Sequence, residues 1–235
     1  MHIMEGVLPA SWCIVWWLLA LPFLALGIRQ LRKVLDTDRE TLPLLSVTGG
    51  FVFILSSLKI PSVPGSSSHP TGTGLSVVSF GPWITTVVGG IVLLFQALFL
   101  AHGGLSTLGA NIVSMGVAGP LIGWVIYRAF RDTRLNPYTT VFLACVYADL
   151  FTYFVTSVQL ALAYPVGGFW TAFLVFMAIF GITQIPIAIL EGVVLSLVFK
   201  YILQLKPDIL IRLKVFSEEK ILATRSDSDA LQIPA

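Results

Sequence analysis

Long apolar stretches separated by short polar ones set the pattern of this chain. A helix crosses a bilayer in about 20 apolar residues. Stretches of this kind predict membrane-spanning helices at residues 9–28, 42–58, 82–101, 108–127 and 138–163. A further apolar run, 168–204, is too long for one straight span and contains Pro186, so it predicts either a kinked helix or two short helices. The expected count is six or seven spans.

Charged residues collect between these spans. Of 235 residues, 14 are Lys or Arg and 12 are Asp or Glu, a charged share of 11% with a formal net charge of +2. A soluble domain carries about 25%. Residues 60–127 contain no charged side chain, and residues 135–199 contain only Asp149 and Glu191. This distribution predicts an all-α, polytopic membrane protein. It excludes a soluble globule, a disordered chain and a nucleic-acid-binding protein, which needs a basic face.

The positive charges predict an orientation. Cytoplasmic loops carry an excess of Lys and Arg, which places the first loop inside because of Arg29, Arg32, Lys33 and Arg39. The N-terminus and the loop 60–81 are then outside. Basic residues near the C-terminus favour an inside end and an odd count of seven: Lys200, Lys206, Arg212 and Lys214. Strict alternation of the spans, however, would put a further basic cluster outside: Arg128, Arg131 and Arg134.

The chain is expected to form one transmembrane domain, residues 1–215, followed by a polar cytoplasmic tail, 216–235. No Lys or Arg precedes the first apolar run, unlike in a secretory signal, so the first segment is expected to be retained. Cys13 and Cys145 lie within apolar runs and are interpreted as small buried hydrophobic residues.

The N-terminus offers a chelating group. If Met1 is kept, its α-amine, the amide nitrogen of His2 and the Nδ1 atom of His2 can bind one metal ion through chelate rings of five and six members. A deprotonated amide favours a square-planar ion, Ni²⁺ or Cu²⁺. His69 is the expected fourth ligand, because its loop is predicted on the same side of the membrane as the N-terminus.

The neighbours of His69 are small and rich in hydroxyl groups. Ser67, Ser68 and Thr71 are candidates for hydrogen bonds that orient the metal ligands. The alternative is a flexible loop with an incidental histidine. His102, the third histidine, follows a predicted span and precedes two glycines, so it is interpreted as a helix-end residue that caps carbonyl groups.

Several spaced blocks of the chain resemble the CbiM/NikM family, the substrate-binding S components of energy-coupling-factor cobalt and nickel transporters. The resemblance covers residues 1–204 and rests on these blocks: Met1-His2-Ile3-Met4-Glu5-Gly6, Leu58-Lys59-Ile60-Pro61-Ser62, Ser68-His69-Pro70-Thr71-Gly72-Thr73-Gly74, Phe95-Gln96-Ala97-Leu98, Ala101-His102-Gly103-Gly104-Leu105, Thr107-Leu108-Gly109-Ala110-Asn111 and Thr183-Gln184-Ile185-Pro186.

The resemblance implies a six-helix S-component core preceded by one N-terminal helix, seven spans in all, in the cell membrane. It implies that Met1, His2 and His69 hold Ni²⁺ or Co²⁺ as the transported substrate. It also implies partners: a transmembrane coupling (T) subunit, two cytoplasmic ATPase subunits and a small accessory membrane subunit. The chain has no Gly-x-x-x-x-Gly-Lys-Ser/Thr loop, so it is not expected to be an enzyme that hydrolyses ATP.

Two further features have open interpretations. Members of the family carry small residues, usually alanines, on the first core helix where it contacts the coupling subunit; here Ser46 and Gly50 have that spacing. They are candidates for the partner interface, and packing within the chain is the alternative. Asp149 and Glu191 are functional candidates because acids are costly within a membrane, with helix packing or a partner contact as alternatives.

The sequence bears on three classes of function. The leading hypothesis is capture of Ni²⁺ or Co²⁺ for ATP-driven uptake, with nickel favoured by the plane of four nitrogens. An ion-coupled secondary transporter of a divalent cation is the alternative, although two widely spaced acids make a sparse relay. An intramembrane metalloprotease is excluded, because no histidine has another four residues away as His-Glu-x-x-His requires.

Overall fold

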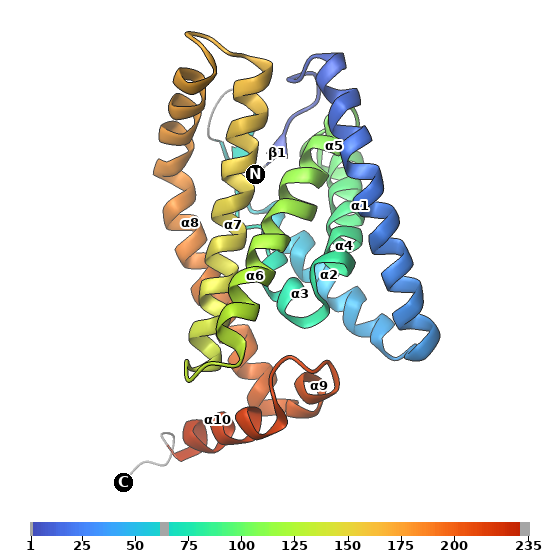
Figure 1. The fold of residues 1–235 in the computed structure, drawn as a ribbon, viewed down its shortest axis with the longest axis vertical. Helices are drawn as coiled ribbons and strands as arrows, with labels where there is room; N and C mark the ends of the chain where they lie inside the picture. The colour runs from blue at the N-terminus through green and yellow to red at the C-terminus, as the bar shows by residue number, and fades with distance from the viewer. Residues whose placement is uncertain (1, 62–65, 231–235) are drawn as a thin grey trace.

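The computed structural model describes residues 2–61 and 66–230 and is a bundle of helices that run along its longest dimension (Figure 1). The longest helices are α1 (Ala10–Thr37), α4 (Pro82–Leu100), α7 (Pro137–Ala163) and α8 (Phe169–Leu205). One continuous helical stretch joins α5 (Leu108–Asn111), the π-helical turn η1 (Ile112–Ala118) and α6 (Gly119–Arg131). The shorter helices are α2 (Thr41–Ser57), α3 (Thr73–Phe80), α9 (Pro207–Arg212) and α10 (Glu218–Ala230).

Five helical stretches of the described chain are long and apolar enough to cross a membrane: Ala10–Thr37, Pro82–Leu100, Leu108–Arg131, Pro137–Ala163 and Phe169–Leu205. Each overlaps a predicted span. The predicted span 42–58 corresponds to α2, which is apolar but only 17 residues long. The run around Pro186 is a single helix of 37 residues, so the alternative of two short helices is wrong. The count of seven crossings remains a prediction.

The segment expected to be a loop, 60–81, contains a buried helix in its described part. Residues 73–78 of α3 are all buried, and α3 packs against α6 and α7. A Cβ atom on Gly74 would lie 2.6 Å from the Cα of Cys145, so the close approach of α3 to α7 requires glycine. Gly81, with φ of +80°, ends α3 and reverses the chain into α4. Eight residues that include Gly and Ser are too short to be recognised as a span.

The C-terminal segment packs on the end of α6. The guanidinium of Arg131 donates to the carbonyl of Lys214 at 2.8 Å. The ammonium of Lys220 donates to the carbonyl of Arg131 at 2.9 Å. Phe216 and Ile221 are buried, although they belong to the stretch predicted as a polar tail. The basic cluster 128–134 therefore lies at the same end of the bundle as the C-terminal segment.

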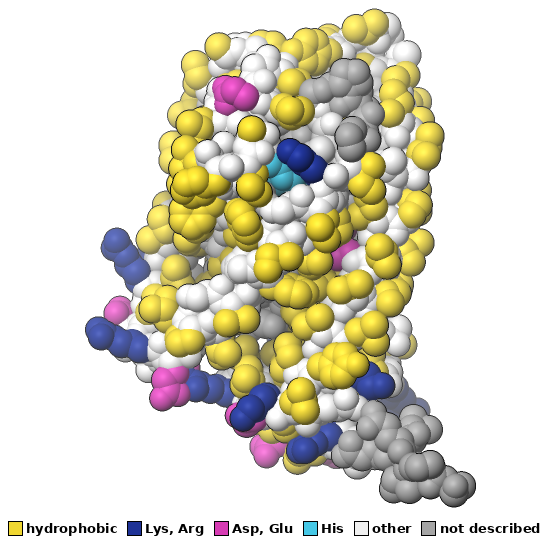
Figure 2. Space-filling model, turned by 180° about the vertical axis from the view of Figure 1, so that it is seen from behind, with side chains coloured by type: hydrophobic (Ala, Val, Ile, Leu, Met, Phe, Trp, Pro, Cys, Tyr) yellow, Lys and Arg dark blue, Asp and Glu magenta, His cyan; other side chains and the backbone are white. Residues whose placement is uncertain are grey.

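The turn between α1 and α2 lies at this end as well. Arg212 of α9 forms ion pairs with Asp38 and with Glu40, the latter at 2.6 Å. Charged side chains gather at this end, whereas apolar side chains cover most of the body (Figure 2). Strict alternation had put 128–134 at the opposite end, which is wrong. The reason is α3, which turns the chain back once more between α2 and α4.

A small sheet lies among the helices instead of at an end of the bundle (Figure 1). Its order is β1-β3-β2, with β1 at His2–Ile3, β2 at Ile60–Pro61 and β3 at Ser66–Ser68. Both pairings are antiparallel, with His2 opposite Ser67 and Ile60 opposite Ser68. The sheet therefore brings the beginning of the chain beside the segment that contains His69.

Candidate metal centre

The strand that carries His2 is bound to the helical stretch 108–131 by side chains. The amide N–H of Ile3 donates to Oδ1 of Asn111 at 2.8 Å, and Nδ2 of Asn111 donates to the carbonyl of Ile3 at 3.0 Å. The hydroxyl of Thr107 donates to the same carbonyl at 2.7 Å. A strand of two residues has few backbone partners of its own, so these bonds determine where His2 lies. Met1, the predicted amine ligand, lies outside the described residues.

Two predicted ligands meet in the interior. Nδ1 of His2 and Nε2 of His69 are 2.5 Å apart, and both side chains are fully buried. Two nitrogens at adjacent corners of a square plane lie about 2.8 Å apart when each is about 2.0 Å from the metal. The two rings therefore present nitrogens at close to the spacing that one shared metal ion requires.

His102 completes a cluster of three imidazoles. One ligand atom from each of His2, His69 and His102 can be chosen so that all lie within 4.8 Å of one another. The ring centroid of His102 is 4.2 Å from that of His2 and 4.9 Å from that of His69. Its Nε2 bonds the hydroxyl of Ser67 at 3.0 Å, and its Nδ1 has no partner among the described residues. The backbone N–H of His102 caps α4, as predicted, by donating to the carbonyl of Gln96 at 3.1 Å, but its side chain bonds Ser67 and not a helix carbonyl.

Burial determines the protonation state of this cluster. Removal from water disfavours imidazolium, so the pKa values of His2 and His69 lie well below the usual range. The same cause lowers the pKa of His102 to about 3. All three rings are therefore neutral near pH 7, the form in which imidazole binds transition metals.

Side chains of α8 bond the loop that follows β3, and one of them is bonded in turn to α7. Glu191 of α8 accepts hydrogen bonds from the backbone and hydroxyl of Thr71. Gln184, also on α8, donates to the carbonyl of His69 at 3.2 Å and to Asp149 of α7 at 2.7 and 2.8 Å. Glu191 thus bonds this loop directly, and Asp149 is connected to it through Gln184.

The three hydroxyl residues predicted to orient the ligands have different partners. Ser67 bonds His102 as described, and Thr71 bonds Glu191. Ser68 bonds the hydroxyl of Thr183 on α8 at 2.8 Å. Within the described chain, no hydroxyl group of the three bonds the ring of His2 or His69. Ser68 and Thr71 hold the loop, and Ser67 bonds the ring of His102.

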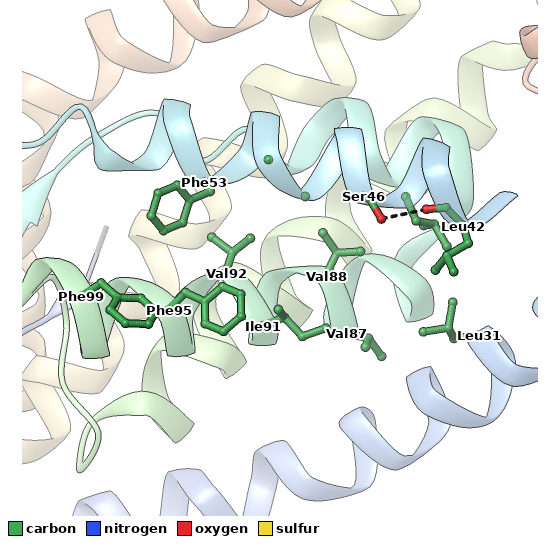
Figure 3. Close-up of a pocket in the computed structure, with 13 residues that line it drawn as sticks. Leu31, Leu42, Ser46, Phe53, Val87, Val88, Ile91, Val92, Phe95 and Phe99 are labelled. Atoms are coloured by element: carbon green, nitrogen blue, oxygen red, sulfur yellow. Dashed lines mark hydrogen bonds between the residues drawn. The ribbon is translucent and has the colours of Figure 1, made fainter.

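Ser46 and Gly50 lie away from the metal centre, on an apolar groove between α2 and α4 (Figure 3). The groove has a volume of about 440 Å³ and is lined mainly by aliphatic and phenyl side chains, among them Phe53, Val88 and Phe95. The hydroxyl of Ser46 donates to the carbonyl of Leu42 at 3.0 Å, which leaves the groove free of an unsatisfied polar group at this position.

The sequence did not predict that Asn111 and Thr107 hold the strand of His2, and it left the role of Glu191 open. One signal could have found the first two. They are polar residues within the long stretch without charge, where a polar side chain must find a partner inside the protein. Nothing in the sequence indicates that the partner is the backbone of Ile3, more than a hundred residues earlier.

The chain is similar to known proteins over nearly its whole length. Residues 2–209 match the model of a family described as CbiM, cobalt uptake substrate-specific transmembrane region. A putative cobalt transport protein CbiM 2 from Methanosphaerula palustris is 64% identical over 98% of this chain and 99% of its own. A putative cobalt transport protein CbiM from Methanocaldococcus jannaschii is 50% identical over 94% and 95%.

Solved structures agree with this similarity. A transition metal transporter superposes with a TM-score of 0.76 at 25% identity, covering 99% of this chain and 100% of its own. The S component for biotin from an ECF-type ABC transporter has a TM-score of 0.52 at 15% identity over 70% of this chain and 93% of its own, a likeness of fold alone. The resemblance identified from the sequence blocks is confirmed, and the chain belongs to the CbiM family.

Proposed function

We propose that this chain captures Ni²⁺ or Co²⁺ from outside the cell as the S component of an ATP-driven energy-coupling-factor transporter. The observation that carries the proposal is the buried pair of nitrogens, Nδ1 of His2 and Nε2 of His69, 2.5 Å apart. Two neutral imidazoles at this distance can share a hydrogen bond in the metal-free protein, and the same spacing lets both nitrogens coordinate one metal ion.

In the proposed complex four nitrogens surround the ion: the amine of Met1, the amide nitrogen and Nδ1 of His2, and Nε2 of His69. Such a plane suits a d⁸ ion and favours Ni²⁺. Membership of a family described by cobalt uptake supports Co²⁺ as a substrate too. His102 offers a ligand atom within 4.8 Å of those of His2 and His69 and is the additional candidate for a contact with the ion.

The charge distribution supports an orientation. The basic clusters 29–39 and 128–134 and the C-terminal segment share one end of the bundle, and positive loops favour the cytoplasm. We assign that end to the cytoplasm, together with the polar tail 216–235. The N-terminus then lies toward the outside, where the metal would be captured.

Energy would come from partner subunits: a transmembrane coupling subunit and two ATPases, with a small accessory membrane subunit. The groove with Ser46 and Gly50 is the proposed contact with the coupling subunit, since small residues let helices approach closely in lipid. The alternative, an ion-coupled secondary transporter, would need acids free to exchange protons. Asp149 and Glu191 instead bond protein donors, which favours the first proposal.

Parallel titrations with Ni²⁺ and Co²⁺ test the metal site. Purified protein should bind Ni²⁺ with the absorption of a planar complex. Insertion of one residue between Met1 and His2 should alter that spectrum and the Ni²⁺ affinity, because it adds a chelate ring and shifts the imidazole relative to His69. His69→Ala should weaken binding strongly. Unchanged nickel affinity in the inserted variant would refute the site. Metal uptake in cells that persists without the ATPase subunits would refute the transport mechanism.

A further inference from the structure

A turn of the backbone directly after His69 surrounds a buried carboxyl group. The N–H of Thr71 donates to Oε2 of Glu191 at 2.5 Å, and the N–H of Gly72 donates to Oε1 at 2.9 Å. The hydroxyl of Thr71 donates to Oε1 at 3.0 Å. Glu191 is 2% exposed and Thr71 is fully buried. All three donors therefore come from two consecutive residues of the loop that carries His69.

The conformation of Gly72 makes this arrangement possible. Its φ of +70° lies in the left-handed region, where glycine has no steric penalty. Successive backbone N–H groups in such a turn can point toward the same side and form a concave site for an anion, as the N–H groups of Thr71 and Gly72 do here. A Cβ atom at Gly72 would also lie 3.0 Å from the Cα of Val52. The turn thus directs two backbone N–H groups at the carboxyl group of Glu191.

Glu191 and the loop depend on each other energetically. A carboxyl group within a membrane protein is tolerated when protein donors replace water. Here the loop provides those donors, and Glu191 in return provides acceptors for two backbone N–H groups that would be buried without partners. Displacement of the loop would leave both sides unsatisfied, so the turn has one strongly preferred position.

We propose that Glu191 is a positioning residue for metal binding: through Thr71 and Gly72 it fixes the loop so that Nε2 of His69 occupies its corner of the metal plane. Glu191 does not touch the metal. The proposal rests on His69 as a metal ligand, as put forward above. It gives the buried acid of α8 a role distinct from proton transfer and from helix packing.

The test is a double-mutant cycle on purified protein with Ni²⁺ as the probe. Glu191→Gln has nearly the same shape but turns an N–H donor toward backbone donors. Loss of charge-assisted hydrogen bonds should weaken nickel binding by about 10- to 100-fold. The nickel absorption band should shift toward that of His69→Ala. In the His69→Ala background, Glu191→Gln should cause no further loss, because the ring that it positions is gone.

Gln96→Leu is the matched control. Gln96 is a buried amide of α4 whose side chain bonds residues of α2, among them Ser56, and no residue of the loop 69–72 in the described chain. This variant should lower the melting temperature while nickel affinity stays within about threefold of wild type. If Glu191→Gln fails to fold, Thr71→Val removes one donor to Glu191 and should weaken binding by about 3- to 10-fold, and Thr71→Ser should restore it.

The outcomes separate the two proposals. Wild-type nickel affinity in Glu191→Gln, or the same loss with and without His69, overturns the positioning role and leaves the metal site standing. Wild-type affinity in His69→Ala overturns the metal site itself, and the positioning role with it. Loss in both single variants without further loss in the double variant supports the positioning role.

Discussion

Asn111 provides a direct test of whether the N-terminal strand is preorganised for metal binding. In Asn111→Ala, the amide N–H of Ile3 loses its acceptor at a fully buried position, while the carbonyl of Ile3 keeps its bond from Thr107. An unsatisfied buried donor costs about 1–3 kcal/mol. The strand would avoid this cost by leaving its place in the metal-free protein.

Metal binding in the variant must then restore the position of His2. The cost of doing so appears as weaker binding, and about 1–3 kcal/mol corresponds to about 5- to 150-fold in Kd. Isothermal titration of purified protein with Ni²⁺ measures this directly. The fold-loss of affinity should be similar for Co²⁺, because the variant perturbs the strand and not the ion.

Gln159→Leu is the control for this experiment. Nε2 of Gln159 donates to the carbonyl of Ala110 at 2.9 Å, one residue from Asn111, but the side chain does not bond the strand. The control should lower the melting temperature and leave the Kd for Ni²⁺ within about threefold of wild type. If Asn111→Ala loses stability to the same degree and binds Ni²⁺ as wild type does, the reasoning about the strand is wrong.

Three further variants address other parts of the molecule. His102→Ala should weaken Ni²⁺ binding by only about 3- to 10-fold and keep the planar absorption spectrum, since the ring is not part of the proposed plane; loss of that spectrum would make it a required ligand. Gly74→Val should lower stability by about 1–3 kcal/mol, seen as a lower melting temperature, because its Cβ would collide with Cys145. Gly50→Leu should leave stability and Ni²⁺ affinity unchanged, because no described atom outside its own helical turn lies within 4 Å of a Cβ there, but should reduce copurification with the proposed coupling subunit; unchanged assembly would place that contact elsewhere.

The distribution of charge predicted most of the helices, since acids and bases are costly in lipid whatever the fold. It failed at α3, because a helix of eight residues that is buried on all sides needs no long apolar run. That one omission put Arg131 at the wrong end of the bundle. Lys220 reaches the carbonyl of Arg131 in the structure, a contact that no local pattern indicates.

At the metal centre, chelation chemistry together with the predicted side of the loop paired His2 with His69, and the structure brings the two rings together. The ligand role itself stays a proposal. The side chain of His102 was misinterpreted because its sequence context is that of a helix end. Ala101 does end α4, in a left-handed conformation with φ of +46°. This turn directs His102 toward His2 of β1 instead of along the helix axis. The left-handed conformation of Ala101 is not predictable from the residue type.

The way these groups are held bears on which metal the site would select. Zn²⁺ prefers a tetrahedron, so to bind it at the same nitrogens the ring of His69 would have to leave the plane. The loop that carries this ring is bonded to α8 at the carbonyl of His69 and at Thr71, and His2 is bonded through Ile3 to Asn111. Each movement would leave buried polar groups without partners. Selection against Zn²⁺ would then come from the rigidity of the surrounding protein, whereas Cu²⁺, which a plane of nitrogens also suits, would not be rejected by geometry.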